Sequence, residues 1–320
     1  MITKMRLLIG YDGSECAGAA IYDLRRAGLP PDVEATLMTC VDLTPHLPAS
    51  CYQPVDAATA AKEPPIVRNA RLLALAAITE AKSTAARGVQ RVKAEFPGWT
   101  VAPETTPDCS AYRALVLKAE KWRPDLLVVG SHGRSAAGRA LLGSVSQKVL
   151  SHAVCSVRVA RFREDASRLA GDPVRIVLGV DGSADSAAAV SAVADRCWPS
   201  GTEIRVVMAV DQRLTVALAY GPHVGMWMPA VPAITDDKTL PSHITDQVAK
   251  ELRRAGMSAV PVVADGDPKQ VLLREAEQFN ADCIFVGAKG HSGLDRFLLG
   301  SVSAAVAARA HCSVEVVRQG

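Results

Sequence analysis

The sequence has 320 residues, of which 49% are hydrophobic and 22% charged, and its formal net charge at pH 7 is only +3. This composition excludes a disordered or fibrous chain, and the length suits two domains of about 150 residues each. Lysines and arginines are scattered rather than clustered, so we expect no nucleic-acid-binding surface.

The eight cysteines stand singly, without a Cys-x-x-Cys pair, and several lie inside apolar runs. A free thiol in such a run acts as a small hydrophobe, a pattern typical of a reducing compartment. The first residues show no signal-peptide pattern, and no apolar run approaches the ~20 residues that span a bilayer. We therefore expect a cytoplasmic protein that does not bind membranes.

The first half begins with an apolar run from Arg6 that ends in Asp12-Gly13-Ser14, a turn and helix N-cap pattern. A second apolar run, 37–41, leads into a Pro-rich segment, 43–67, which holds most of the extra length of the first half. The helices predicted next are 71–96 and 111–121, and the later strands are 126–129 and 155–159.

The second half repeats this order. The run from Arg175 ends in Asp181-Gly182-Ser183, and a later strand, 206–210, matches 37–41. Helices are predicted at 185–197, 243–255 and 268–279, and strands at 283–286 and 312–316. The segment 215–234, equivalent to the Pro-rich one, is unusually apolar, and it is either a loop packed on its own domain or a mobile lid or docking surface. It is our candidate for docking an unknown protein partner.

Strands that alternate with helices of this length predict crossover connections and parallel sheets. The strands are apolar throughout, as expected when helices cover both faces. The fold class is therefore α/β, with two tandem open, doubly wound, parallel five-stranded sheets. We place domain 1 at residues 1–162, a linker at 163–173 and domain 2 at 174–320, because a charged run closes there with Gly-Asp-Pro.

Each half also carries one glycine pattern behind a buried strand. Gly130-Ser131-His132-Gly133 is followed after nine residues by Gly143-Ser144, and Gly287-Ala288-Lys289-Gly290 after nine residues by Gly300-Ser301. Bare backbone N–H groups and a helix N-terminus attract phosphate. We call each pattern a cradle and predict that it binds phosphate, although such glycines also serve tight turns alone.

His132 and His291 occur in the two cradles but at different offsets, so we expect no shared catalytic role for them. Asp12 and Asp181 end equivalent strands, where each either caps a helix or faces ribose or a phosphate-bound metal. No base recurs at a common position near Ser144 and Ser301, so we predict no catalytic residue. We also assign no metal-ligating residue.

With these motifs the chain resembles the universal stress protein family, as a tandem two-domain member with the Gly-x-x-Gly-x9-Gly-Ser pattern of its ATP-binding representatives. The resemblance implies ATP with Mg²⁺, adenine held by the backbone of Val41 and Val210, ribose and phosphate contacts at Asp12 and Asp181, and phosphates held by the cradles. It also implies an intramolecular pseudo-dimer of the two domains, with a homodimer as a further option. The nucleotide-binding residues are then Asp12, Val41, Gly130, Gly133, Gly143, Ser144, Val145, Asp181, Val210, Gly287, Gly290, Gly300, Ser301 and Val302.

We therefore expect an ATP-binding regulatory protein of the universal stress response class that acts as a nucleotide-dependent switch. The alternatives are a slow ATP hydrolase and a scaffold with a degenerate first pocket. A dinucleotide-dependent oxidoreductase is disfavoured, since its glycine fingerprint belongs in the first strand-to-helix turn. The first half has Cys109-Ser110-Ala111 where the second has Gly266-Asp267-Pro268, so we expect the second pocket to bind nucleotide better.

Overall fold

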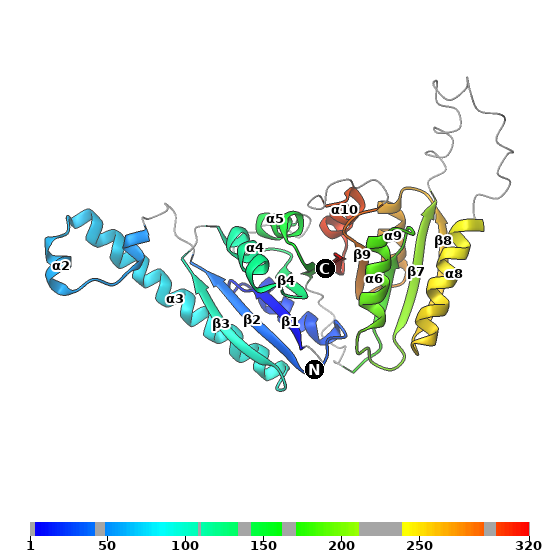
Figure 1. Cartoon of the computed structure of the whole chain (residues 1–320), viewed down its shortest axis with the longest axis horizontal. Coiled ribbons are helices and arrows are strands. Elements are labelled where there is room, and N and C mark those ends of the chain that lie inside the picture. The colour runs from blue at the N-terminus through cyan, green and yellow to red at the C-terminus, as the bar shows by residue number, and fades with distance from the viewer. Residues whose placement is uncertain are drawn as a thin grey trace, which may run out of the picture. The chain divides into compact units, whose positions relative to one another are not determined.

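A computed structural model of the chain (Figure 1) describes residues 4–41, 49–107, 110–133, 142–161, 171–210, 239–290 and 299–319. These residues form two compact units. Unit 1 holds the first five strands and unit 2 the last five. The segment 215–234, which we predict to dock a partner, lies outside the described residues, as do Cys109 and His291.

Unit 1 contains five strands in the order β3-β2-β1-β4-β5, and its recorded pairings are all parallel. Its strands are β1 (Met5–Gly10), β2 (Val33–Cys40), β3 (Thr100–Thr106), β4 (Leu126–Gly130) and β5 (Ser156–Ala160). Its helices are α1 (Glu15–Asp23), η1 (Leu24–Arg26), η2 (Ala49–Tyr52), α2 (Ala57–Lys62), α3 (Pro65–Glu95), α4 (Ala111–Trp122) and α5 (Ser144–His152). The strand order reverses beside β1, which places a crevice at the carboxyl ends of β1 and β4.

Unit 2 repeats this topology, with strand order β8-β7-β6-β9-β10. Its strands are β6 (Arg175–Gly179), β7 (Glu203–Val210), β8 (Ser258–Asp265), β9 (Cys283–Gly287) and β10 (Ser313–Val317). Its helices are α6 (Ala184–Ala194), α8 (Thr239–Arg254), α9 (Pro268–Gln278) and α10 (Ser301–Arg309). The prediction of two tandem, parallel, doubly wound five-stranded units is confirmed.

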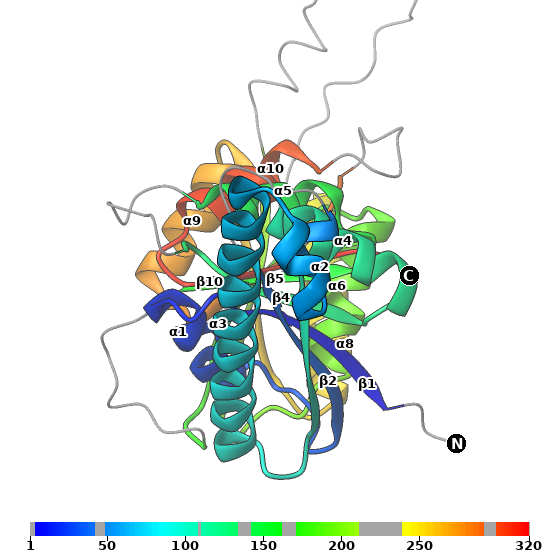
Figure 2. The same cartoon turned by 90° about the vertical axis from the view of Figure 1, so that its left-hand side faces the viewer.

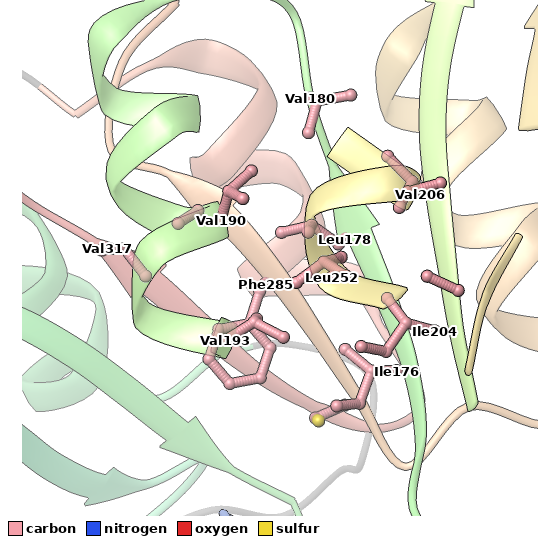
Figure 3. Close-up of a cluster of buried hydrophobic side chains, with 14 of the residues drawn as sticks. Ile176, Leu178, Val180, Val190, Val193, Ile204, Val206, Leu252, Phe285 and Val317 are labelled. Carbon is pink, nitrogen blue, oxygen red and sulfur yellow. The ribbon is translucent and has the colours of Figure 1, made fainter. Parts of the chain in front are cut away.

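The core of unit 2 shows why the strands are apolar throughout. Ile176, Leu178 and Phe285 project from the sheet to meet Val193 of α6 and Leu252 of α8 (Figure 3). All five side chains are almost completely inaccessible to water. Burial of each such side chain stabilises the fold by roughly 1.5–3 kcal/mol, so this cluster fixes α6 and α8 against one face of the sheet.

Each unit also buries one arginine–carboxylate pair on its last strand. Arg158 of β5 donates from Nε to Oδ2 of Asp23 over 2.6 Å. In unit 2 the charges are reversed, since Glu315 of β10 accepts from Arg196. Buried ions are costly unless paired, so these contacts fix the end of α1 and the segment after α6 against their sheets.

The Pro-rich segment after β2 contains helices that the sequence did not predict. Its described part contains η2 and α2, and α3 begins at Pro65, six residues before the predicted start. A proline suits the first position of a helix because the N–H that it lacks has no helical partner there. Asp56 caps α2 by accepting a hydrogen bond from the Thr59 N–H over 2.7 Å.

The side chain of Arg71 ties this segment to α3. It is 8% exposed, pairs with Glu63 and donates to the carbonyls of Ser50 and Gln53. The hydrogen bond from Arg71 holds the pKa of the Glu63 carboxyl below its ordinary value. Figure 2 shows α2 beside the N-terminal half of α3.

In the part of the chain that the structure describes, no helix is both long and apolar enough to cross a membrane.

Candidate functional site

A single cavity collects the predicted site residues of unit 1. It has a volume of about 420 Å³. Asp12, Val41, Gly130, Gly133, Gly143, Ser144 and Val145 all line it. They come from the carboxyl ends of β1, β2 and β4 and from the N-terminus of α5. Its size falls in the range of small-molecule sites, roughly 300–1,000 Å³.

Asp12 and Asp181 are fixed by the turns that follow their strands. In each, Oδ1 accepts a hydrogen bond over 2.9 Å, from the Ser14 N–H and the Ser183 N–H respectively. The helix N-caps are these two serines, so the alternative that the aspartates cap the helices is wrong. The second carboxylate oxygen, Oδ2, faces the cradle: a Cβ added to Gly133 would lie 3.1 Å from Oδ2 of Asp12.

The first cradle glycine of each unit lets a helix approach the turn. A Cβ at Gly130 would lie 2.9 Å from the carbonyl oxygen of Cys16 in α1. A Cβ at Gly287 would lie 2.6 Å from the carbonyl carbon of Asp185 in α6. Glycine is therefore required here by close backbone contact, which brings the first turn of α1 or α6 directly against the cradle.

The glycine before α5 or α10 forms a hydrogen bond within its own cradle. The Gly143 N–H donates to the Ser131 carbonyl over 2.7 Å, and the Gly300 N–H donates likewise to Ala288. Neither N–H is available to a ligand, contrary to our expectation for these two glycines. The next N–H groups, those of Ser144 and Val145, have no hydrogen-bond partner among the described residues, as is usual in the first turn of a helix.

Two serines that sequence analysis did not single out hold this closure in place. The hydroxyl of Ser146 donates to the Gly130 carbonyl over 2.6 Å, and that of Ser303 donates to the Ala288 carbonyl over 2.9 Å. Both are buried. The available signal was the repeated Ser-Val-Ser that follows Gly143 and Gly300.

The cradle of unit 1 presents four backbone N–H groups that bond to no described residue, those of His132, Gly133, Ser144 and Val145. Within the described chain, the buried Nε2 of His132 also has no partner, while its Nδ1 lies 3.1 Å from Oγ of Ser131. Unpaired donors at a helix N-terminus suit an anion.

The Val41 backbone is only half available. Its N–H donates to the Thr106 carbonyl over 2.9 Å, whereas no described residue donates to its own carbonyl. In unit 2 the Val210 carbonyl already accepts from the Gly266 N–H over 3.0 Å. A base placed in the cavity of unit 1 would therefore meet an acceptor at Val41, which suits an amino group.

Lys148 and Tyr112 complete the cavity of unit 1, and sequence analysis missed both. The Lys148 ammonium lies 4.8 Å from the centre of the Tyr112 ring, a cation–π contact. Lys148 follows Ser144 by four residues, one turn along the same helix face. In unit 2 the residue four positions after Ser301 is Ala305.

Comparison with known proteins gives matches along the whole chain. Residues 4–161 and 174–318 each match the model of the Universal stress protein family. A universal stress protein of Mycolicibacterium smegmatis is 30% identical over 327 residues, which cover 99% of this chain and 98% of that protein.

Solved structures match as well. The crystal structure of a universal stress protein from Archaeoglobus fulgidus covers 98% of this chain and 96% of its own, with a TM-score of 0.59 and 17% identity. A universal stress protein family protein from Arabidopsis thaliana, solved with AMP bound, covers 46% of this chain and 93% of its own, with a TM-score of 0.33 and 18% identity.

Proposed function

The chain belongs to the universal stress protein family, with two tandem copies of its domain, and on that premise we propose that it is an ATP-binding regulatory protein. The observation that carries this proposal is the cavity of unit 1, in which unpaired backbone N–H groups and a lysine face one space. In the proposal, nucleotide occupancy changes the conformation or partner affinity of the chain, which thus works as a switch in the stress response.

The phosphates occupy the cradle. The N–H groups of His132, Gly133, Ser144 and Val145 donate to their oxygens, and the dipole of α5 adds about 0.3–1 kcal/mol. Lys148 supplies the one positive side chain that lines this cavity among the described residues. These groups favour a polyphosphate over a neutral ligand because each is a hydrogen-bond donor or a cation.

The nucleoside lies toward β1 and β2. The Val41 carbonyl accepts from the amino group of adenine, and Oδ2 of Asp12 faces the ribose hydroxyls or the phosphate chain. Mg²⁺ would accompany ATP and would neutralise phosphate charge. Among the described residues no group of three His, Cys, Asp or Glu side chains could hold a metal, and Asp12 is the carboxylate lining this cavity that would serve as a ligand beside phosphate oxygens and water.

Slow hydrolysis of ATP is the second candidate. The observation in its favour is Nε2 of His132, a buried nitrogen in the cradle that has no hydrogen-bond partner among the described residues and could exchange a proton with an attacking water. Regulation is preferred because no hydrogen bond joins the hydroxyl of Ser144 or Ser301 to a described histidine or carboxylate.

The first test is to denature freshly purified protein and identify the released nucleotide by chromatography and mass spectrometry. Adenine nucleotide at about one per chain or more supports the proposal, and ADP in place of ATP favours hydrolysis. If none is released, titration with Mg-ATP decides. Wild-type protein that binds no adenine nucleotide at millimolar concentration, about −4.1 kcal/mol at the 1 mM limit, contradicts the proposal.

A further inference from the structure

The two cradles differ in one hydrogen bond at their centre. In unit 2, Oδ2 of Asp185 accepts from the Lys289 N–H over 2.9 Å. Lys289 occupies the place of His132, whose N–H has no described partner in unit 1. Asp185 follows Asp181 by four residues, and the residue four positions after Asp12 is Cys16. A carboxylate thus lies against the second cradle, where the first has a thiol.

We propose that Asp185 closes the second cradle to phosphate, so that the chain binds the phosphates of one adenine nucleotide, in unit 1. This inference rests on the proposed function and assigns Asp185 as the residue that decides which unit binds the nucleotide. It reverses the expectation from sequence that the second pocket is the better one.

Asp185 is held in position by the fold rather than resting there loosely. It lies in the first turn of α6, where the positive end of the helix dipole favours a carboxylate. Gly287 brings that turn within 2.6 Å of the place a Cβ would occupy, so the side chain starts beside the cradle. Its reach to the Lys289 N–H follows from that backbone contact.

The carboxylate opposes a phosphate in two ways. It already accepts the hydrogen bond that the Lys289 N–H would give to a phosphate oxygen, and it adds a negative charge next to that oxygen. Like charges in a partly buried site repel strongly because the effective dielectric constant is low. The ammonium group of Lys289 adds a positive charge, but the Lys289 N–H stays bonded to Asp185 and cannot donate to a phosphate.

Two further differences point the same way. The Val210 carbonyl accepts from the N–H of Gly266, which has φ of +130°, and the first half lacks this Gly-Asp-Pro sequence. The Val41 carbonyl meets no donor among the described residues. The Gly-Asp-Pro sequence suggested better nucleotide binding in the second half, but its glycine donates to the Val210 carbonyl, which was expected to hold adenine. Ala305 also stands where unit 1 has Lys148, which lines the cavity.

The test exchanges the two side chains in the full-length protein. Native mass spectrometry counts bound nucleotide, and equilibrium titration with Mg-ATP measures affinity, for wild type, Asp185→Ala, Cys16→Asp and the double variant. Cys16→Asp places an acidic residue in the first turn of α1, which helices tolerate, so it remains informative if Asp185→Ala fails to fold.

The expected counts are one nucleotide for wild type, two for Asp185→Ala, none for Cys16→Asp and one for the double variant. Cys16→Asp should weaken binding at least thirtyfold, and Asp185→Ala should leave the affinity of the first site unchanged. Two nucleotides on wild type, or one that persists on both single variants, would overturn the inference while the proposed function stands. No binding by any of the four proteins would overturn the proposed function itself.

Discussion

Residue 16 of unit 1 and residue 185 of unit 2 occupy the same place in the fold, in the first turn of the helix that lies against the first cradle glycine. One is a cysteine and the other an aspartate, and only the aspartate accepts a cradle N–H. The strands, glycines and helix starts around them agree closely. Duplication has preserved the backbone of the site, while side chains beside it determine what each copy can hold.

The largest difference between the two units is expected from substitution of the first cradle glycine. Gly287→Ala would place a Cβ within 2.6–2.8 Å of three backbone atoms of α6, whereas Gly130→Ala meets its nearest backbone atoms at 2.9–3.3 Å. We expect Gly287→Ala to lower the stability of unit 2 by about 3 kcal/mol, and Gly130→Ala to cost unit 1 less. Amide hydrogen exchange, measured by mass spectrometry on peptides of each unit, reports the stability of the two units separately.

Gly171→Ala is the matched control for these substitutions. A Cβ at Gly171 has nothing within 4 Å, so we expect little change in exchange. Equal losses from Gly287→Ala and Gly130→Ala would show that the closer approach of α6 has no energetic consequence.

The third glycine of the motif, Gly143 or Gly300, allows the two sites to be tested separately. A side chain at Gly143 would press on the Ser131 carbonyl and on Cα of His132, both 3.2 Å from its Cβ. We expect Gly143→Val to weaken Mg-ATP binding about 100-fold, equivalent to two hydrogen bonds to a charged group at about 1.5 kcal/mol each. Gly300→Val should leave that affinity unchanged in calorimetric titration. A loss confined to Gly300→Val would place the nucleotide in unit 2.

Lys148 and Ala305 allow a finer test of the same contrast. We expect Lys148→Ala to weaken ATP binding about fivefold, since a partly exposed charge pair contributes about 1 kcal/mol. Adenosine, which lacks phosphate, should bind both proteins equally. Ala305→Lys adds the missing lysine to unit 2 and should not restore binding there while Asp185 is present. An equal effect of Lys148→Ala on adenosine would argue against a phosphate contact.

The smallest expected effect concerns the α2 segment of unit 1. The hydrogen bond from Arg71 lowers the pKa of Glu63 from 4.5, and the Thr59 N–H lowers the pKa of Asp56 from 3.8. A lowered folded-state pKa stabilises the segment above the unfolded value, and this contribution is lost as pH falls through the folded value. Protease cleavage within α2 should therefore increase on acidification below pH 4.5.

Glu63→Gln provides the control for that titration. It removes one of the two carboxyls and leaves Asp56, so cleavage should increase at neutral pH and the remaining rise should move to more acidic pH. The same pH profile in wild type and Glu63→Gln would exclude the Glu63–Arg71 pair as its cause.

The sequence predicted the fold well because its signals were local and occurred twice. Apolar runs, helical spacing and the repeated Asp-Gly-Ser turns are properties of short segments, and their order specified two parallel sheets. The early start of α3 was missed because it depends on the contacts of Arg71 with Glu63 and with the carbonyls of Ser50 and Gln53. Such contacts join separate stretches, which periodicity does not report.

The site divides in the same way. The glycines and Asp12 were found from spacing, and all the predicted unit 1 residues meet in one cavity. Other features depend on how two segments approach each other, and spacing does not report them. They are the hydrogen bond from the Gly143 N–H to Ser131, the position of Lys148 in the cavity, and the contact between Asp185 and Lys289. The Gly-Asp-Pro sequence suggested a better site in unit 2, but the N–H of its glycine, Gly266, donates to the Val210 carbonyl of that site.

The most direct measurement is to photolabel the full-length protein with 8-azido-ATP and Mg²⁺ and to map the labelled peptides by mass spectrometry, with excess ATP as competitor. The account predicts competitor-sensitive label on peptides of unit 1, near Val41 and Tyr112, which line its cavity. Competitor-sensitive label of equal yield on the equivalent peptides of unit 2, near Val210 and Lys269, would contradict it.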